Sequence, residues 1–245
     1  MKIQPISDIH LDHQADNGDS FLKSLTPAPG VDLLIVAGDL ANANRPDLWG
    51  KAYESFSKKW PHTLVVKGNH DFFGTKTKEE VMRASRLLLP KNVHLLDNEI
   101  ISLGGKTFYG GTGWFPYSPR GVLSQSLMAD FQLIPDVEKW IYDDRKTFKS
   151  RFEACDVAIT HHVPHKNCIS RQYWGSTLND FFLGDFWEEL DDFSPPLWVF
   201  GHTHDHVDIN HFSSPSGKRT RMVCNPFGYP QEGSRMYKDG FTVEI

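Results

Sequence analysis

Cysteine is scarce in this sequence, and long hydrophobic runs are absent. The 245 residues include only three cysteines, Cys155, Cys168 and Cys224, which are widely spaced and form no Cys-x-x-Cys motif. This pattern argues against a disulfide framework and is natural for a reducing compartment. No run approaches the ~18 apolar residues of a transmembrane helix, and the N-terminal stretch MKIQPISDIH lacks the apolar core of a signal peptide. We therefore predict a soluble protein of the cytoplasm, with no membrane partner.

A surplus of basic residues is also missing. The formal net charge is −5 at pH 7, which argues against a general nucleic-acid-binding protein but is compatible with a local basic pocket for a phosphate. Hydrophobic residues make up 39% and aromatic residues 13% of the chain, as in globular proteins. Because no linker, repeat or low-complexity tract interrupts the sequence, we predict a single domain over residues 1–245. The oligomeric state stays open.

Short apolar runs typical of buried strands recur along the chain. They are residues 2–7, 31–37, 62–66, 106–110, 156–160, 196–200 and 221–224. Helical patterns alternate with the first of these runs, whereas strands cluster later in the sequence. This order predicts an α/β or α+β domain with layered sheets.

Four segments have helical character. Residues 47–59 begin with Asp47 as the expected N-cap, and residues 77–89 begin with the capping-box pair Thr77 and Glu80. Weaker patterns predict helices over residues 136–153 and 178–192.

Polar groups of metal-binding types follow five of the predicted strands. They are Asp8 and His10; Asp39; Asn69, His70 and Asp71; His161 and His162; and His202 and His204. Each group alone is more often a turn or a cap. Because the carboxyl ends of neighbouring strands meet at one edge of a sheet, the conjunction predicts a shared metal centre. We expect Gly201 to let the backbone bend so that the rings of His202 and His204 turn inward, while His206 lies beyond the cluster.

These motifs are similar, in content and order, to those of the calcineurin-like metallophosphoesterase superfamily. They are Asp8-x-His10, Gly38-Asp39, Gly68-Asn69-His70-Asp71, Thr160-His161-His162 and Gly201-His202-Thr203-His204. The resemblance covers most of the chain. It implies an α+β fold with four layers, α/β/β/α, in which helices flank a two-sheet β-sandwich.

The resemblance also implies a centre of two divalent metal ions. By position, Asp8, His10 and His204 would bind one ion, Asn69, His161 and His202 would bind the other, and Asp39 would bridge both. Mixed nitrogen and oxygen ligands suit Mn, Fe, Zn or Ni, without deciding among them. Such a pair of ions lowers the pKa of a shared water, so that a bridging hydroxide can attack phosphorus.

His70 is expected to act as the catalytic acid rather than as a ligand. It is next to Asn69, so its ring can protonate the departing oxygen at the rim of the site. In many relatives an acidic residue orients this histidine. Here Asn42 stands at that position, and Asp71 is the alternative partner. His162 is expected to support the ligands without binding metal.

The loops at residues 112–135 and 163–184 are expected to select the substrate. Candidate contacts in these loops and beyond them are Trp114, Arg120, Arg171, Asn225 and Tyr229. Aromatic rings stack on bases and arginine binds phosphate, but packing of the aromatic residues onto the core explains them equally well. We predict hydrolysis of a small phosphodiester or phosphomonoester, nucleotides included. The alternatives are a nuclease of the same superfamily and a non-catalytic scaffold that retains the fold.

Overall fold

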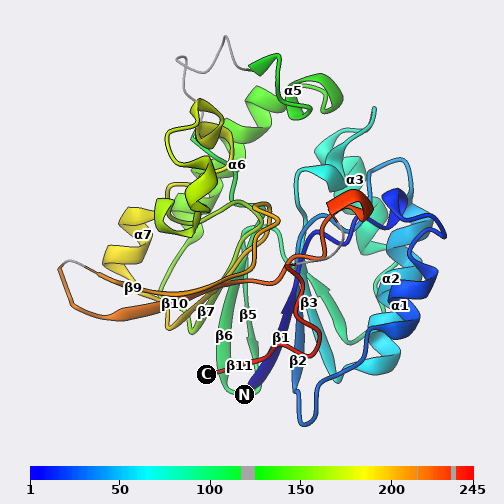
Figure 1. Ribbon diagram of the computed structural model, residues 1–245, viewed down its shortest axis with the longest axis horizontal. Helices are drawn as coiled ribbons and strands as arrows, with labels where there is room; N and C mark the ends of the chain where they lie inside the picture. Colours follow the sequence, from blue (N-terminus) through cyan, green and yellow to red (C-terminus); the bar gives the residue numbers. More distant parts are fainter. Residues whose placement is uncertain (117–124, 214, 233–235) are drawn as a thin grey trace.

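Two mixed β-sheets lie face to face, with helices on their outer sides (Figure 1). This computed structural model describes residues 1–116, 125–213, 215–232 and 236–245. The strand order is β11-β1-β2-β3-β4 in the first sheet and β5-β6-β7-β8-β10-β9 in the second. The arrangement confirms the predicted α+β fold of a β-sandwich flanked by helices.

Every predicted apolar run forms a strand, and the described part of the chain contains four further strands. The first sheet contains β1 (Lys2–Ile6), β2 (Leu33–Ala37), β3 (His62–Val66), β4 (Val93–Leu95) and β11 (Val243–Glu244). The second contains β5 (Glu99–Leu103), β6 (Lys106–Gly110), β7 (Val157–Ile159), β8 (Leu197–Val199), β9 (Val207–Phe212) and β10 (Arg219–Cys224). The strands that sequence reasoning missed, β4, β5, β9 and β11, are the four edge strands. Edge strands escape such reasoning because they are short or half-exposed and lack a continuous apolar run.

The core between the sheets is built from alternate residues of each strand. In β2, Leu33 and Ile35 face the opposing sheet, whereas Leu34 and Val36 belong to the cluster under the helices. In β8, Trp198 likewise packs away from the sandwich interior. Successive side chains of a strand point to opposite faces. Strands covered on both sides are therefore apolar throughout, which made them visible in the sequence.

Helices cover both outer faces. The first sheet is covered by α1 (Asp19–Ser24), α2 (Pro46–Lys59) and α3 (Lys78–Arg86). The second sheet carries α6 (Val137–Arg151) and α7 (Trp187–Asp192), whereas α5 (Asp130–Leu133) lies at the top of Figure 1 and its Phe131 packs against the same cluster as α2 and α3. Short 3₁₀ turns lie between these elements: η1 (Leu11–His13), η2 (His70–Phe72), η4 (Lys166–Cys168), η5 (Arg171–Tyr173), η6 (Thr177–Phe181) and η7 (Pro230–Glu232).

The predicted helix ends are correct in part. Thr77 and Glu80 form the expected capping box, but α3 ends at Arg86 and not at residue 89. Asp47 is not an N-cap. The helix begins one residue earlier at Pro46, and Asp47 pairs with Arg45 in its first turn (Nη2–Oδ2 2.9 Å).

The helix expected over residues 178–192 is interrupted. It divides into η6 and α7, because the segment between them pairs with another part of the chain. Leu183 forms a β-bridge with Val163, and the amide of Gly184 donates to the carbonyl of Val163 at 2.8 Å. This pairing closes the segment between Val163 and Gly184 into a loop.

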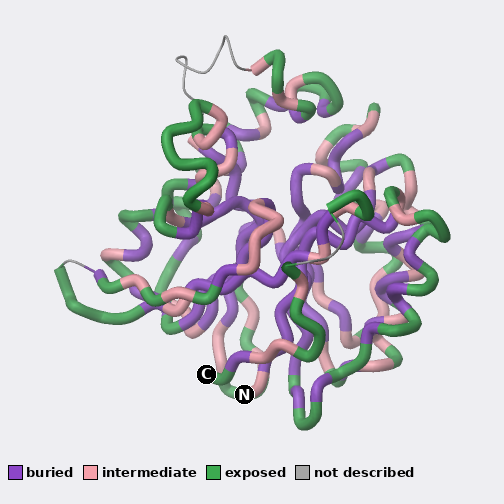
Figure 2. The backbone as a smooth tube through the Cα atoms, in the orientation of Figure 1, coloured by how far each residue is buried: buried purple, intermediate pink, exposed green. Residues whose placement is uncertain are grey.

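Buried backbone is concentrated in the two sheets and in the loops at the edge where they meet, as Figure 2 shows. Polar loops rarely lie so deep unless their backbone groups are paired. Within the described part of the chain, no helix is long and apolar enough to cross a membrane.

Candidate metal centre

The five strand-end motifs meet at this buried edge. The loops after β1, β2 and β3 come from the first sheet, and those after β7 and β8 come from the second. Main-chain hydrogen bonds tie neighbouring loops together: the amide of His10 donates to the carbonyl of Asp39 (3.0 Å), and that of Gly201 donates to the carbonyl of His161 (3.0 Å). The positions of the side chains are therefore fixed by the two sheets.

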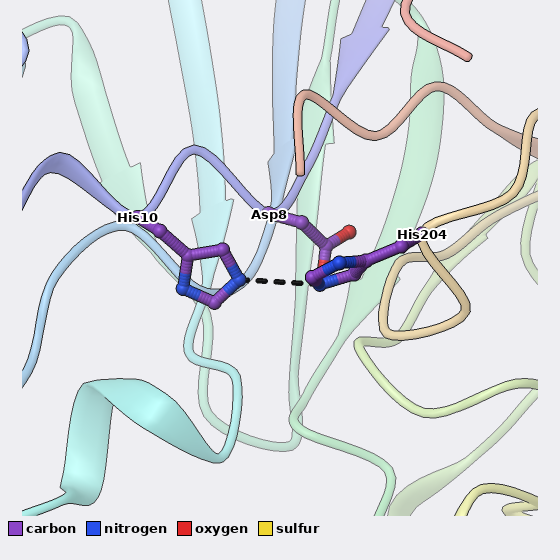
Figure 3. A group of neighbouring side chains, drawn as sticks. All are labelled: Asp8, His10 and His204. Atoms are coloured by element: carbon purple, nitrogen blue, oxygen red, sulfur yellow. Dashed lines mark hydrogen bonds and ion pairs between the residues drawn. The ribbon is translucent and has the colours of Figure 1, made fainter. Parts of the chain in front are cut away.

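Asp8, His10 and His204 form the first group of ligand-type atoms. In Figure 3 their polar ends point toward one another. Nε2 of His204 lies 3.2 Å from Nε2 of His10 and 3.4 Å from Oδ1 of Asp8. One atom from each residue falls within 4.8 Å of the other two, which is close enough to share a metal ion.

Asp39, His161 and His202 form the second group, with the same 4.8 Å limit. Asn69 joins it, since its Oδ1 lies 3.0 Å from Nε2 of His161. Nε2 of His202 is buried and has no hydrogen-bond partner among the described residues. Asp39 connects the two groups, because its Oδ2 lies 3.7 Å from Nε2 of His10 and 3.4 Å from Nε2 of His161.

Five of the ligand-type residues hold a backbone conformation that is costly for side chains other than glycine. Positive φ angles of 46–69° occur at Asp8, His10, Asp39, His202 and His204. Each such residue costs of order 1–3 kcal/mol in stability, and residues of this kind cluster at functional sites. The role expected for Gly201 is therefore wrong, because the histidines themselves make the bend. Gly201 is needed for space, since a Cβ there would lie 2.6 Å from the carbonyl oxygen of Ala37.

Two buried carboxylates place negative charge at the centre. Burial acts to raise the pKa of Asp39, but His161 and His70 hold it well below its usual value. Burial likewise works against protonation of His161, yet Asp39 raises its pKa to about 9. Burial also disfavours protonation of His204, but Asp8 raises its pKa to about 9. The centre thus stabilises positive charge, and its imidazole, carboxylate and amide groups are ligand types that suit divalent metal ions.

Neither expected partner holds the ring of His70. Asp71 is buried and accepts from the amides of Asp39 and Gly68 (both 2.9 Å), and from Nζ of Lys67 (3.3 Å). Its carboxylate therefore shapes the loop and does not reach the ring. Oδ1 of Asn42 accepts from the amide of Asn44 (3.0 Å), which turns it away from that role.

Tyr229 contacts His70 instead. Its hydroxyl lies 2.9 Å from Nε2 of His70, and its ring stacks on His10 with centroids 4.3 Å apart. On the other side, Phe73 packs against His70 with a ring separation of 4.1 Å. His70 also lies close enough to His10 and Asp39 to form a third, overlapping group of ligand-type atoms. It is therefore placed at the boundary of the two ligand groups.

His162 lies behind His202, in keeping with a supporting role. Its Nδ1 is 3.4 Å from the carbonyl of Thr112, and its ring packs 4.5 Å from that of His202. Burial lowers the pKa of His162 to about 3, so the ring that packs against His202 is neutral at pH 7.

Most of the predicted substrate contacts do not face the centre. Trp114 is only 1% exposed and packs in the core, so it offers no surface to a substrate. Asn225 is buried and holds the C-terminal segment, donating to the carbonyls of Pro5 (3.2 Å) and Lys238 (3.1 Å). Arg171 stacks on Trp174, outside the cavity lining described next. Arg120 lies outside the described residues. Tyr229 does face the centre.

A cavity of about 320 Å³ opens beside the ligand groups. Its lining includes Asp39, Asn69, His70, His202 and His204, and continues along apolar side chains of the 163–182 region.

Two acidic residues at this cavity escaped sequence reasoning. Asp130 is 1% exposed and accepts from Nδ2 of Asn69 at 2.7 Å, which turns Oδ1 of Asn69 toward His161. Glu232 lies 2.7 Å from Nδ1 of His204 and accepts from the amide of Tyr229 at 2.8 Å. Neither residue follows a strand or belongs to a motif, so no sequence signal could have identified it.

Comparison with known proteins agrees with this geometry. The sequence model of the family described as calcineurin-like phosphoesterase matches residues 1–206. An uncharacterised protein of Acanthamoeba polyphaga mimivirus is 25% identical over 239 residues, covering 81% of this chain and 83% of the viral protein. The crystal structure of a phosphopantetheinyl hydrolase from Mycobacterium tuberculosis superposes with a TM-score of 0.75 at 17% identity, covering 100% of this chain and 95% of that one.

Proposed function

The chain belongs to the calcineurin-like phosphoesterase family, and on this basis we propose that it hydrolyses a small phosphoester at a centre of two divalent metal ions. The observation that supports two ions is the pair of ligand groups that meet at Asp39 and border one cavity. Asp8, His10 and His204 would hold one ion, Asn69, His161 and His202 the other, and Asp39 both.

The residues around the centre have different roles in the proposed reaction. When bound, the ions would neutralise phosphoryl oxygens and activate a water molecule for attack on phosphorus. His70, on the cavity lining, donates a proton to the oxygen of the departing alcohol. Burial lowers the pKa of His70, although Asp39 opposes the shift, and this makes its protonated form a stronger donor. Tyr229 keeps the ring facing the cavity through the contact at Nε2.

The two alternative functions have less support. A nuclease needs a basic track for the phosphate backbone, whereas Asp130 and Glu232 place carboxylates at this cavity. In a non-catalytic scaffold, no function would offset the cost of the strained backbone at five ligand-type residues, two of which are the buried carboxylates Asp8 and Asp39.

A substrate panel tests the proposal. The protein is assayed with Mn, Fe, Zn or Ni against phosphomonoesters, cyclic and linear phosphodiesters, and DNA. A phosphopantetheinyl ester belongs in the panel because a phosphopantetheinyl hydrolase shares the fold. We expect metal-dependent hydrolysis of a small ester and little action on DNA. Metal-loaded protein that hydrolyses none of these compounds would contradict the proposed function.

The variant His70→Ala separates catalysis from metal binding. Loss of a general acid should lower turnover of unactivated esters by roughly 10²–10⁴-fold and leave the metal content intact. His62→Ala, at the opposite end of β3, is the control and should behave as the wild type. If His70→Ala loses metal in parallel with activity, His70 is a ligand and the assignment as acid is wrong.

A further inference from the structure

One wall of the cavity is mainly apolar and begins directly at the ligand groups. Apolar side chains from segments far apart in the chain line it: Phe73, Met128, Val163, Ile169, Leu178 and Phe182. The ring of Phe182 lies 4.4 Å from that of His202, and the ring of Phe73 lies 4.1 Å from that of His70. An organic group attached to a phosphorus atom at the centre would therefore lie against this apolar wall.

The wall is held in place by the loop that carries most of it. The amide of Val163 donates to the carbonyl of Phe182 at 3.1 Å, and Val163 also pairs with Leu183, so the two ends of the loop are joined. Within the loop, Nδ2 of Asn179 donates to the carbonyl of Tyr173 at 2.9 Å. The apolar surface is thus formed before any ligand binds, as is usual for small-molecule sites.

The other charged side chains on the lining are acidic. Besides the histidines and Asp39 of the centre, Asp130 and Glu232 line the cavity. Among the residues that the structure describes, no lysine or arginine joins them. A phosphoryl group at the centre would be attracted by the two divalent ions of the proposed function. A further anionic group along the wall would face carboxylates, apolar surface and the neutral groups of Tyr173, Ser176 and Asn179. It would lose hydration there without gaining a cationic partner among the described lining residues.

We propose that the centre selects phosphoesters whose organic group is apolar and uncharged, and discriminates against nucleotides and other esters with further negative charge. This inference rests on the proposed function, since it concerns the same site. Burial of the organic group supplies the affinity, because each buried methylene improves binding by roughly fourfold. A negative charge on the organic group reverses that gain in affinity.

A matched series of esters tests the selectivity. Hydrolysis of ethyl phosphate, hexyl phosphate and 5-carboxypentyl phosphate is compared with the Mn²⁺-loaded protein. We expect kcat/KM for hexyl phosphate to be at least about tenfold higher than kcat/KM for ethyl phosphate. We expect it to exceed kcat/KM for 5-carboxypentyl phosphate by a similar factor. Equal use of the hexyl and carboxypentyl esters would overturn the inference, as would a preference for the latter.

A charge placed in the wall supplies a second test. Leu178→Lys adds an ammonium group beside the organic part of the substrate, so the preference for hexyl over carboxypentyl phosphate should fall about tenfold. Leu87→Lys makes the same change at a residue that is 82% exposed and outside the cavity, and its preference should match the wild type. An unchanged preference in Leu178→Lys would show that the wall does not contact the substrate.

Phosphonates separate this inference from the proposed function. Hexylphosphonate and 5-carboxypentylphosphonate lack a cleavable ester bond, and calorimetry measures their binding without turnover. Preferential binding of hexylphosphonate without hydrolysis of any ester would contradict the proposed function and support the selectivity. Hydrolysis of the esters without preferential binding would support the function and overturn the selectivity.

Discussion

The ligand loops and the apolar wall border the same cavity, but the side chains that they present are held by different forces. In the ligand loops, directional bonds fix each group, such as the bonds from the amides of Asp39 and Gly68 to Asp71. In the wall, Val163 and Ile169 pack in one apolar cluster and Phe182 packs against another, in the segments between short 3₁₀ turns. Hydrogen-bonded groups tolerate little displacement, whereas apolar side chains of similar size can replace one another. Substitutions in the loops should therefore abolish the chemistry, and substitutions in the wall should change the choice of substrate.

The largest effect is expected at Asp39, which connects the two ligand groups. Asp39→Asn removes the charge that both groups share, so the metal content should fall below two equivalents per chain. Activity should fall by more than the roughly 10–100-fold seen when a residue that only supports a ligand is changed. Elemental analysis after dialysis measures the metal, and esterase assays measure the activity. A variant that retains two full equivalents would refute the bridging role.

Asp71 tests whether the loops depend on directional bonds for their stability. Asp71→Ala leaves Lys67 buried and unpaired, and it frees the amides of Asp39 and Gly68. Breaking a buried ion pair typically costs about 3–5 kcal/mol in the free energy of unfolding, and urea denaturation measures it. The double variant Lys67→Met with Asp71→Asn should recover part of that loss. A cost below about 1 kcal/mol for Asp71→Ala would mean that the loops are held mainly by packing.

The sequence predicted the ligand loops because they directly follow buried strands. An apolar run marks each strand, and the polar residues after it reach the edge where the strands end, as they do for Asp8 and His202. The four edge strands were missed because their residues are exposed on one side or too few. The fold class needed only the buried strands and the motifs.

The rest of the site could not be predicted because it comes from segments with no periodic pattern. Asp130 lies on the short helix α5, and Glu232 lies on the turn η7 near the C-terminus. Residue type was also misleading. Trp114 and Asn225 have side chains suited to a substrate, yet Trp114 packs in the core and Asn225 bonds to the main chain. Only tertiary contacts distinguish these roles.

Asp130 tests whether a residue outside the ligand loops controls their ligands. Asp130→Ala removes the acceptor that orients Asn69, so the affinity for the metal held by Asn69 should fall about 10–100-fold. Asp130→Asn keeps an acceptor oxygen and should restore most of that affinity. Titration of chelator-treated protein with Mn²⁺ measures the metal affinity of both variants. Asp143 is an exposed residue of α6, and Asp143→Ala is the control. Wild-type affinity in Asp130→Ala would show that Asn69 needs no support.

The smallest effect is expected at Tyr229, which belongs to both regions because it lines the cavity and contacts His70. Tyr229→Phe keeps the ring that stacks on His10 and removes one hydrogen bond of about 1 kcal/mol. The kcat for unactivated esters should therefore fall about fivefold, with metal content and the preference for apolar esters unchanged. The pH profile of kcat should shift as well, because the hydroxyl no longer contacts Nε2 of the acid. A changed ester preference with normal kcat would instead place Tyr229 with the wall and remove it from the catalytic apparatus.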